Sequence, residues 1–305
     1  GCKFFKVTIP SSVTSVGKSC FSECSELVVV DLSSSITVLS NSVFKRCSSL
    51  NKIVIPSSVT IIDENAFMGC KSLIEISIPQ SVKEIRSSVF EDCTSIKEIT
   101  IPSSVNVIGS STFSKCTSLK NITIPESVTS VNGMIFYKCT SLKSVEILSS
   151  ITAIKYNAFS QCSSLEKVVL PPSVNVIEEK AIECCNSLVE ITIPSSCKKI
   201  ENSAFKDCVA LKKVVLSSCL ETIGFNLFYG CKSLEQIEIP SSLKIIEIEN
   251  FRNCSSLSQL SIPTSLIEIK DYAFAGCTSL KQISIPSSIK VAKSSFQAET
   301  QVTII

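Results

Sequence analysis

The chain has 305 residues, 44% of them hydrophobic, and its 29 basic and 27 acidic residues leave a net charge of +2. This composition excludes a disordered chain, and the interspersed charges form no basic stretch typical of nucleic-acid or membrane binding. The sequence has no histidine, which removes the commonest general base and the Ser-His and Cys-His nucleophile pairs, so we predict that it is not an enzyme.

A cysteine recurs at every twenty-third position along most of the chain. This ladder comprises Cys24, Cys47, Cys70, Cys93, Cys116, Cys139, Cys162, Cys185, Cys208, Cys231, Cys254 and Cys277. With each ladder cysteine as position 1, position 4 is Leu or Ile, positions 7 and 9 are aliphatic, and position 10 is usually proline. From residue 21 to residue 274, position 21 is Phe in eleven of twelve cases, Ile182 being the exception. Such a fixed period predicts a solenoid in which each unit forms one coil.

Each coil is predicted to begin with a short strand. In the stretch LIEISIP, residues 73–79, Leu73, Ile76 and Ile78 face inward while the polar residues between them face outward. Pro79 ends the strand because proline cannot donate a hydrogen bond to a neighbouring strand. A serine turn, a second short extended segment at residues 81–85 and a tight turn containing the phenylalanine complete the coil. Neighbouring strands are expected to stack in parallel, about 4.8 Å apart.

Both ends of the chain fall within a unit. Gly1 occupies a position 1, and residues 302–305 resemble the start of another strand. The stretch SSIKVAKSSF, residues 287–296, is one residue short of the repeat, so we expect an irregular last coil. We therefore predict one solenoid over residues 1–305, with about 13 coils, that was cut from a longer array or carries caps disguised as repeats.

The repeated core LxxIxIPxSVxxIxxxAFxxC resembles the BspA-like, or Treponema pallidum-type, leucine-rich repeat. The resemblance covers essentially the whole chain, although serine stands at position 12 where ordinary leucine-rich repeats carry asparagine. It implies a right-handed leucine-rich-repeat solenoid with a parallel concave β-sheet, turns and short 3₁₀ segments on the convex side, and little or no α-helix. The family occurs in surface proteins of oral bacteria and treponemes and in parasitic protists. Its members look like adhesins or surface antigens, and none of its motif positions is catalytic.

Three explanations compete for the cysteine ladder. The ladder has the same period as the inward-facing Leu, Ile and Phe residues, and cysteine is among the most buried residue types, which favours a packed spine of thiols. Disulfides between neighbouring coils are the main alternative, but in-register side chains hold their Cβ atoms too far apart. Metal binding is disfavoured because a line of single thiols brings at most two near one ion.

The five cysteines outside the ladder are predicted from their positions in the repeat. Cys20 and Cys197 replace small or hydrophobic residues and are expected to be buried, whereas Cys2, Cys184 and Cys219 are expected to be more exposed. Cys197 and Cys219 lie at adjacent turn positions of neighbouring coils, so they are the pair to check for a disulfide. The phenylalanine column is interpreted as a buried spine, in which each ring contributes roughly 1.5–3 kcal/mol.

A binding site in a solenoid is expected on the extended concave face. Positions 5, 6 and 8 of each coil point outward there, and the side chains vary most along the charged central stretch. The candidate protein-binding residues are Glu75, Glu98, Lys120, Asn121, Lys143, Glu146, Lys167, Glu190, Lys212, Lys213, Glu235 and Glu238. A solvated sheet face without a partner remains the alternative, since the strip has few aromatic residues typical of binding hot spots.

These observations favour a non-enzymatic protein-interaction module, with no cofactor, no metal, no nucleic acid, no membrane-spanning segment and no small-molecule substrate expected. The leading hypothesis is the repeat region of a cell-surface or secreted adhesin or surface antigen that binds host or matrix proteins. Another copy of the same protein is a third expected class of protein partner. A cytoplasmic scaffold with the same geometry is the alternative. An enzyme using Ser164 and Lys167 is a distant third, because Ser164 is the serine that recurs at position 3.

Overall fold

The computed structural model describes residues 3–305, within which the chain divides into two compact units. The first unit ends at Ile151, and the second runs from Thr152 to Ile305. Each unit consists of short parallel strands joined by turns, and no helix occurs among the described residues. The predicted all-β solenoid is therefore confirmed. The expectations for Gly1 and Cys2 lie outside the described residues.

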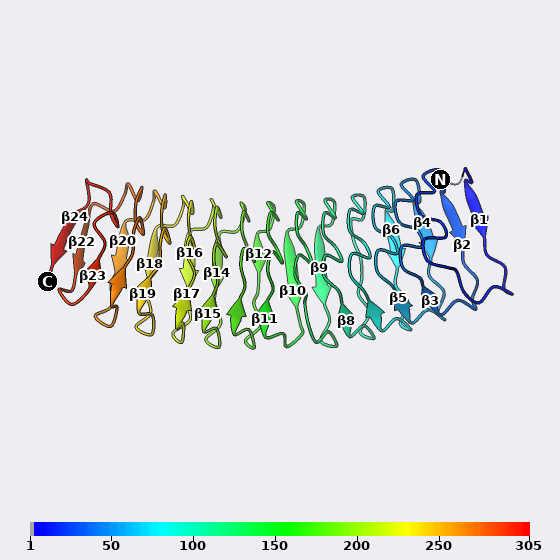
Figure 1. Cartoon of the computed structure of the whole chain (residues 1–305), viewed down its shortest axis with the longest axis horizontal. Coiled ribbons are helices and arrows are strands. Elements are labelled where there is room, and N and C mark those ends of the chain that lie inside the picture. The colour runs from blue at the N-terminus through cyan, green and yellow to red at the C-terminus, as the bar shows by residue number, and fades with distance from the viewer. Residues whose placement is uncertain (1–2) are drawn as a thin grey trace. The chain divides into compact units, whose positions relative to one another are not determined.

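The first unit carries strands on two sides of its coils (Figure 1). One side, which we call the first sheet, contains β1 (Lys6–Thr8), β2 (Val29–Asp31), β4 (Lys52–Val54), β6 (Glu75–Ser77), β9 (Asn121–Ile124) and β10 (Ser144–Ile147). The other side, the second sheet, contains β3 (Val38–Leu39), β5 (Ile61–Ile62), β7 (Glu84–Ile85) and β8 (Val107–Ile108). Strand β4 pairs with β6 in parallel, with Lys52 opposite Glu75, as the period of the repeat requires.

The second unit has the same two sides. Its first sheet contains β12 (Lys167–Val168), β14 (Glu190–Thr192), β16 (Lys213–Val215), β18 (Gln236–Glu238), β20 (Gln259–Ser261), β22 (Gln282–Ile285) and β24 (Gln301–Ile304). Its second sheet contains β11 (Ala153–Ile154), β13 (Val176–Ile177), β15 (Lys199–Ile200), β17 (Thr222–Ile223), β19 (Ile245–Ile246), β21 (Glu268–Ile269) and β23 (Lys290–Val291). The second extended segment of the repeat is thus itself a paired strand.

The last coil departs from the period as the sequence predicts. Glu268 of β21 lies opposite Lys290 of β23, and Gln282 of β22 lies opposite Gln301 of β24. Both steps along the chain are shorter than the regular repeat, the second more so than the first. The missing residues shorten the turns but leave the strand pairing intact. Strand β24 confirms the expected strand near residues 302–305.

The core of each coil is formed by the recurring leucine, cysteine and phenylalanine. Leu73, Phe90 and Cys93 are fully buried in the first unit, as are their equivalents in the second. Phe90 stacks on Phe67 and on Phe113, with ring centroids 5.7 Å apart in both pairs. The predicted phenylalanine spine is confirmed. Ile182, which replaces phenylalanine in one coil, is also fully buried.

The side of the coil that carries the phenylalanine is a row of turns, and no 3₁₀ segment occurs between residues 3 and 305. Positions 19 and 23 adopt left-handed backbone conformations, for example Ser88 (φ 56°) and Asp92 (φ 60°). This conformation costs about 1–2 kcal/mol for a residue with a side chain. It turns the N–H groups of Ser88, Phe90 and Asp92 toward the next coil, where each donates to a carbonyl at 2.9 Å. A 3₁₀ turn would keep those N–H groups within its own coil.

The serine at position 12 has a defined structural role. Ser58, Ser81 and Ser127 each donate a hydrogen bond from Oγ to a backbone carbonyl of the preceding coil, at 2.6 Å. Ser104 donates to the carbonyl of Val82 at 2.8 Å. This row of bonds ties neighbouring coils together at the turn that follows each first-sheet strand.

Replacing Ser104 with alanine is expected to lower the free energy of unfolding by about 1 kcal/mol, because the carbonyl of Val82 loses a donor. Its neighbour Ser103 is exposed and no side-chain hydrogen bond is seen for it in the structure, so Ser103→Ala is a matched control with little expected effect. Urea unfolding of the two variants measures the difference. Equal stability of the variants would contradict the role assigned to Ser104.

Candidate functional site

All twelve predicted binding residues are exposed on the same side of their units. Eight lie in or at first-sheet strands: Glu75, Glu98, Asn121, Glu146, Lys167, Glu190, Lys213 and Glu238. Four immediately precede a first-sheet strand: Lys120, Lys143, Lys212 and Glu235. The alternation of the strand explains this arrangement, since the hydrophobic residue between each pair of outward side chains turns into the core.

Hollows lie on the exposed face of the first sheet in both units. The hollow over β16, β18 and β20 has a volume of about 720 Å³ and includes the candidates Lys213 and Glu238. Its neighbour over β12 and β14 measures about 620 Å³ and includes Lys167, Glu190 and also Lys213. The two hollows share Lys213 and Val215, so they form one continuous surface within the second unit. We call this surface the strand groove.

A third hollow, of about 380 Å³, lies in the first unit and includes the candidates Glu98 and Asn121. The remaining six candidates line none of these three hollows: Glu75, Lys120, Lys143, Glu146, Lys212 and Glu235. Asn121 accepts a hydrogen bond from Ser144 Oγ at 2.8 Å, and Glu146 accepts one from Thr123 at 3.3 Å. These contacts hold polar groups of neighbouring strands together on the face of the first unit.

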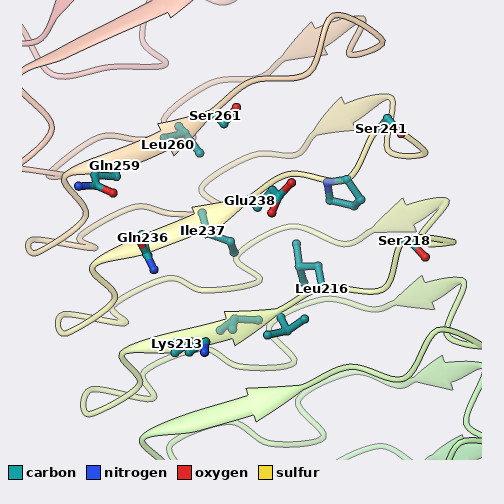
Figure 2. Close-up of a pocket in the computed structure, with 13 residues that line it drawn as sticks. Lys213, Leu216, Ser218, Gln236, Ile237, Glu238, Ser241, Gln259, Leu260 and Ser261 are labelled. Carbon is teal, nitrogen blue, oxygen red and sulfur yellow. The ribbon is translucent and has the colours of Figure 1, made fainter.

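The strand groove also contains hydrophobic residues that are not among the twelve predicted binding residues. Val169 and Val215 are 58% and 44% exposed, which is unusual for valine, and Leu216 lies just beyond the end of β16. Figure 2 shows Gln236 and Gln259 at the starts of neighbouring strands and Leu216 at the opposite side of the hollow. These valines could have been found in the sequence, because they stand at position 8, where most coils carry a polar residue.

Charged residues along the groove alternate in sign from coil to coil. Lys167, Glu190 and Lys213 occupy position 6 of three successive coils, and Glu190 lies directly opposite Lys213 in the strand pairing. None of the three forms an ion pair with any described residue. Their charged groups are therefore available to an external partner.

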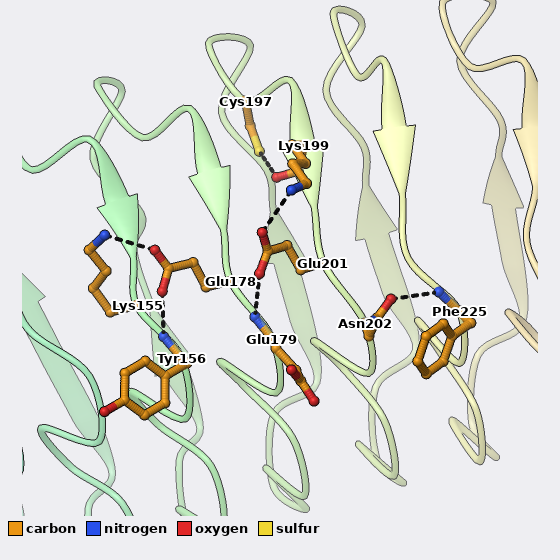
Figure 3. Close-up of polar contacts among 9 residues, drawn as sticks. All are labelled: Lys155, Tyr156, Glu178, Glu179, Cys197, Lys199, Glu201, Asn202 and Phe225. Atoms are coloured by element: carbon orange, nitrogen blue, oxygen red, sulfur yellow. Dashed lines mark hydrogen bonds and ion pairs between the residues drawn. The ribbon is translucent and has the colours of Figure 1, made fainter.

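On the second sheet of the same unit the charged residues are, by contrast, tied to the protein itself. Lys155 Nζ lies 2.7 Å from Glu178 Oε1, and the other carboxylate oxygen of Glu178 accepts a hydrogen bond from the backbone N–H of Tyr156 (Figure 3). Lys199 and Glu201 form a similar ion pair at 2.8 Å. Carboxylates that accept bonds from neighbouring coils have a structural role, so the second sheet is a weaker candidate for binding.

The ladder thiols hydrogen-bond to the turn that carries the phenylalanine. Cys93 Sγ donates to the carbonyl of Phe67 at 3.1 Å, and the same carbonyl accepts the backbone N–H of Cys70 at 3.0 Å. Cys231 donates in the same way to the carbonyl of Phe205 at 3.2 Å. A side chain at position 1 must be small, apolar and able to donate one weak bond, and cysteine meets all three requirements.

The structure supports the packed-spine explanation of the ladder. Cys70, Cys93, Cys116 and Cys231 are fully buried free thiols, and burial raises their pKa values well above the ordinary value of 9.0. Burial likewise raises the pKa of Cys277 to about 12. A neutral buried thiol is a poor nucleophile and a poor metal ligand. No group of three or more metal-ligating side chains occurs within residues 3–305.

Three of the four described off-ladder cysteines lie as predicted. Cys197 is fully buried, Cys219 is exposed and Cys184 is half-buried. Cys197 and Cys219 are free thiols, and Cys197 Sγ lies 3.5 Å from the carbonyl of Lys199 (Figure 3). The prediction for Cys20 was wrong, because this residue is exposed. It lies in the first described coil, and no other described coil packs on its N-terminal side.

A brief pulse of iodoacetamide on the native protein is expected to alkylate Cys20 and Cys219 while sparing Cys93 and Cys197, because only the first two thiols are exposed. Mass spectrometry of the digested protein measures the labelling of each cysteine. The same pulse in denaturant is the control and should label all four alike. Rapid native labelling of Cys93 would contradict the buried spine.

The Ser164–Lys167 pair does not form a catalytic arrangement. Ser164 is half-buried in the turn before β12, whereas Lys167 is exposed on the strand, and no hydrogen bond joins them in the structure. No described helix is long and apolar enough to cross a membrane. The exposed face of the first sheet therefore remains the best candidate for a functional surface.

Comparisons with known proteins agree with this fold. The family described as "BspA type Leucine rich repeat region (6 copies)" matches residues 1–116, 83–212 and 198–305. A leucine-rich repeat protein from Bacteroides ovatus is 28% identical and has a TM-score of 0.69, over 99% of this chain and 92% of that one. A search of curated proteins found no significant match.

Two further solved structures are similar. A leucine-rich repeat protein from Eubacterium ventriosum is 23% identical with a TM-score of 0.54, over 92% of this chain and 84% of that one. A leucine rich cell surface protein from Faecalibacterium prausnitzii is 25% identical with a TM-score of 0.48, over 96% and 89%. The family match spans the described coils and both of their sheets. The chain belongs to the BspA-type leucine-rich repeat family.

Proposed function

We propose that the chain is the repeat region of a cell-surface or secreted protein and that it binds host or matrix proteins through the exposed face of the first sheet. The observation that carries the proposal is the contrast between the two sheets of the second unit. Lys167, Glu190 and Lys213 are exposed and make no ion pair with described residues, whereas Lys155 and Glu178 of the second sheet bond to each other.

The mechanism is the sum of many modest contacts on a rigid surface. Parallel strands in a fixed register hold the exposed side chains at regular intervals. A surface that is already ordered loses little conformational entropy on binding, so weak polar contacts can still give useful affinity. The strand groove adds hydrophobic area at Val169 and Val215, which charged contacts alone would lack.

The surface location rests on the family resemblance rather than on the geometry. A cytoplasmic scaffold is the second candidate, and the free thiols of the ladder favour it, because cysteines of cytosolic proteins are kept reduced. Antibody staining of intact and permeabilised source cells separates the two. Staining of intact cells is expected. Staining only after permeabilisation would contradict the proposed surface location. Partners should then be sought in the cell's own lysate.

The binding face is tested by substitutions that leave the core intact. Replacing Glu190, Lys213 and Glu238 with alanine together is expected to weaken binding of the purified chain to host cells or matrix-coated wells by about tenfold or more. Lys198→Ala with Glu221→Ala removes an exposed ion pair of the second-sheet side and serves as the control. Equal binding by both variants would exclude the face of the first sheet.

A further inference from the structure

We propose that the strand groove binds an amphipathic α-helix of a partner protein, lying across the strands so that each helical turn meets one coil. This inference rests on the proposed function, since it names the kind of partner that the exposed face would bind. The helix would carry acidic, basic and acidic residues on successive turns, opposite Lys167, Glu190 and Lys213. An adjoining stripe of leucine or similar residues would cover Val169 and Val215.

The first argument is charge complementarity. The signs +, − and + follow one another at position 6 of three coils, and all three side chains are exposed and outside any ion pair within the described chain. Glu190 lies opposite Lys213 in the pairing of β14 with β16, yet the carboxylate and the ammonium group form no ion pair with each other. Their side chains stand side by side on the sheet, so a partner can approach all three charges from the same direction.

The second argument is the spacing of the charges. Successive strands lie about 4.8 Å apart, and an α-helix presents one residue of a given stripe about every 5.4 Å. The mismatch is about 0.6 Å per coil, which long side chains absorb over three coils. An extended peptide places same-face residues about 6.8 Å apart. Its side chains would therefore lose alignment with the charges on successive strands after one coil.

A polyproline helix fits less well. Its repeat of about 9.3 Å would match every second coil, so a peptide with two acidic residues could reach Lys167 and Lys213. Nothing on that face of the peptide would then meet Glu190, which lies between the two lysines. The alternation of charge therefore favours the α-helix among the three regular backbone conformations.

The third argument is the hydrophobic border of the charged column. Val169 and Val215 lie two residues after Lys167 and Lys213 in the chain, Val169 just beyond the end of β12 and Val215 at the end of β16, and both are exposed. Leu216 and Pro240 continue this border beside the hollow. One side of the groove is thus charged, and the other carries Val169 and Val215 with Thr192 between them and Glu238 at its end. The two valines match a hydrophobic stripe that adjoins the charged stripe of an amphipathic helix.

The test uses two helical peptides of about 15 residues on an alanine-rich background. The first carries Glu, Lys and Glu on one stripe at positions i, i+4 and i+7, with leucines on the adjoining stripe. The second has the same sequence with the signs reversed. Fluorescence anisotropy at low salt, with the purified chain, is expected to give the first peptide an affinity at least about tenfold higher than the second.

Charge reversal of the protein provides the decisive comparison. The combined variant Lys167→Glu, Glu190→Lys and Lys213→Glu is expected to invert the preference between the peptides. The matched control, Lys52→Glu with Glu75→Lys, reverses an equivalent in-register pair in the first unit and should leave the preference unchanged. A version of the first peptide with a central proline, which breaks the helix, is expected to bind about tenfold more weakly.

Three results would overturn the inference. These are equal affinity for the two peptides, absence of binding by either up to about 1 mM, or undiminished binding of the proline-containing peptide. Each leaves the proposed function open, because a partner could bind the same face through another structure. Loss of cell or matrix binding on the alanine substitutions described above tests that broader proposal independently.

Discussion

Raising the pH from about 8 to about 10 is expected to unfold the protein or to remove most of its stability. Buried thiols cause this effect. Burial raises the pKa of Cys277 from 9.0 to about 12, and it raises the pKa values of the other affected ladder thiols well above 9.0. Those others are Cys70, Cys93, Cys116, Cys185, Cys231 and Cys254.

The direction follows from proton binding. Above pH 9 the unfolded chain loses the thiol protons while the folded chain keeps them, so stability is complete below that pH and falls as the pH rises toward the folded-state pKa. At pH 10 each such thiol disfavours the folded state by about 1 kcal/mol. Seven of them together disfavour it by roughly 5–10 kcal/mol, which is comparable with the whole stability of a typical domain.

Urea unfolding followed by circular dichroism at several pH values measures the effect. Cys116→Ala removes one of the seven groups and should reduce the loss of stability by about 1 kcal/mol between pH 9 and pH 10. The variant is less stable at neutral pH, so the slope with pH is the quantity to compare. A stability that stays constant between about pH 9 and pH 10 would show that the ladder thiols are not buried.

The substitution Phe113→Ala is expected to lower the free energy of unfolding by about 3–5 kcal/mol. Phe113 is fully buried and stacks between Phe90 and Phe136, with both centroid distances at 5.7 Å. Removing the ring leaves a cavity bounded by two other rings that are fixed by their own coils, so the space cannot collapse fully. Because each coil contacts mainly its neighbours, the loss should concentrate around that coil.

Phe225 provides the control, since its side chain is 47% exposed at a turn. Phe225→Ala should cost less than about 1 kcal/mol. Equilibrium unfolding gives the total change for each variant, and hydrogen exchange shows whether protection is lost chiefly in the coils next to residue 113. Equal effects of the two substitutions would argue against a continuous stack as the main stabiliser.

Most of the fold could be predicted from the repeat, because one physical condition applies to every coil. A residue that recurs once in every repeat must meet the same environment each time, so the burial of Leu73, Phe90 and Cys93 follows from periodicity alone. Alternation then identifies the outward residues, and all twelve candidates are indeed exposed. Cys20 is an exception, because a repeat position is buried only where a neighbouring coil covers it.

Other features required the assembled coils. Very short strands such as β7 have no stability alone and exist because the equivalent segments of the neighbouring coils pair with them. The left-handed conformations of Ser88 and Asp92 are unfavourable locally, and hydrogen bonds to the next coil compensate for them. The resemblance implied short 3₁₀ segments on this side of the coil, but the hydrogen bonds between stacked coils stabilise left-handed turns there instead.

The sequence by itself determined the period, the core residues, the family and the face that is exposed. Only the tertiary structure decided which exposed residues act together. Lys167, Glu190 and Lys213 are each one full repeat apart in sequence and become neighbours on the sheet, with Val169 and Val215 beside them. It also decided which charges are already paired, as in Lys155 with Glu178. Side-chain pairing depends on distances between coils, and a linear sequence does not contain those distances.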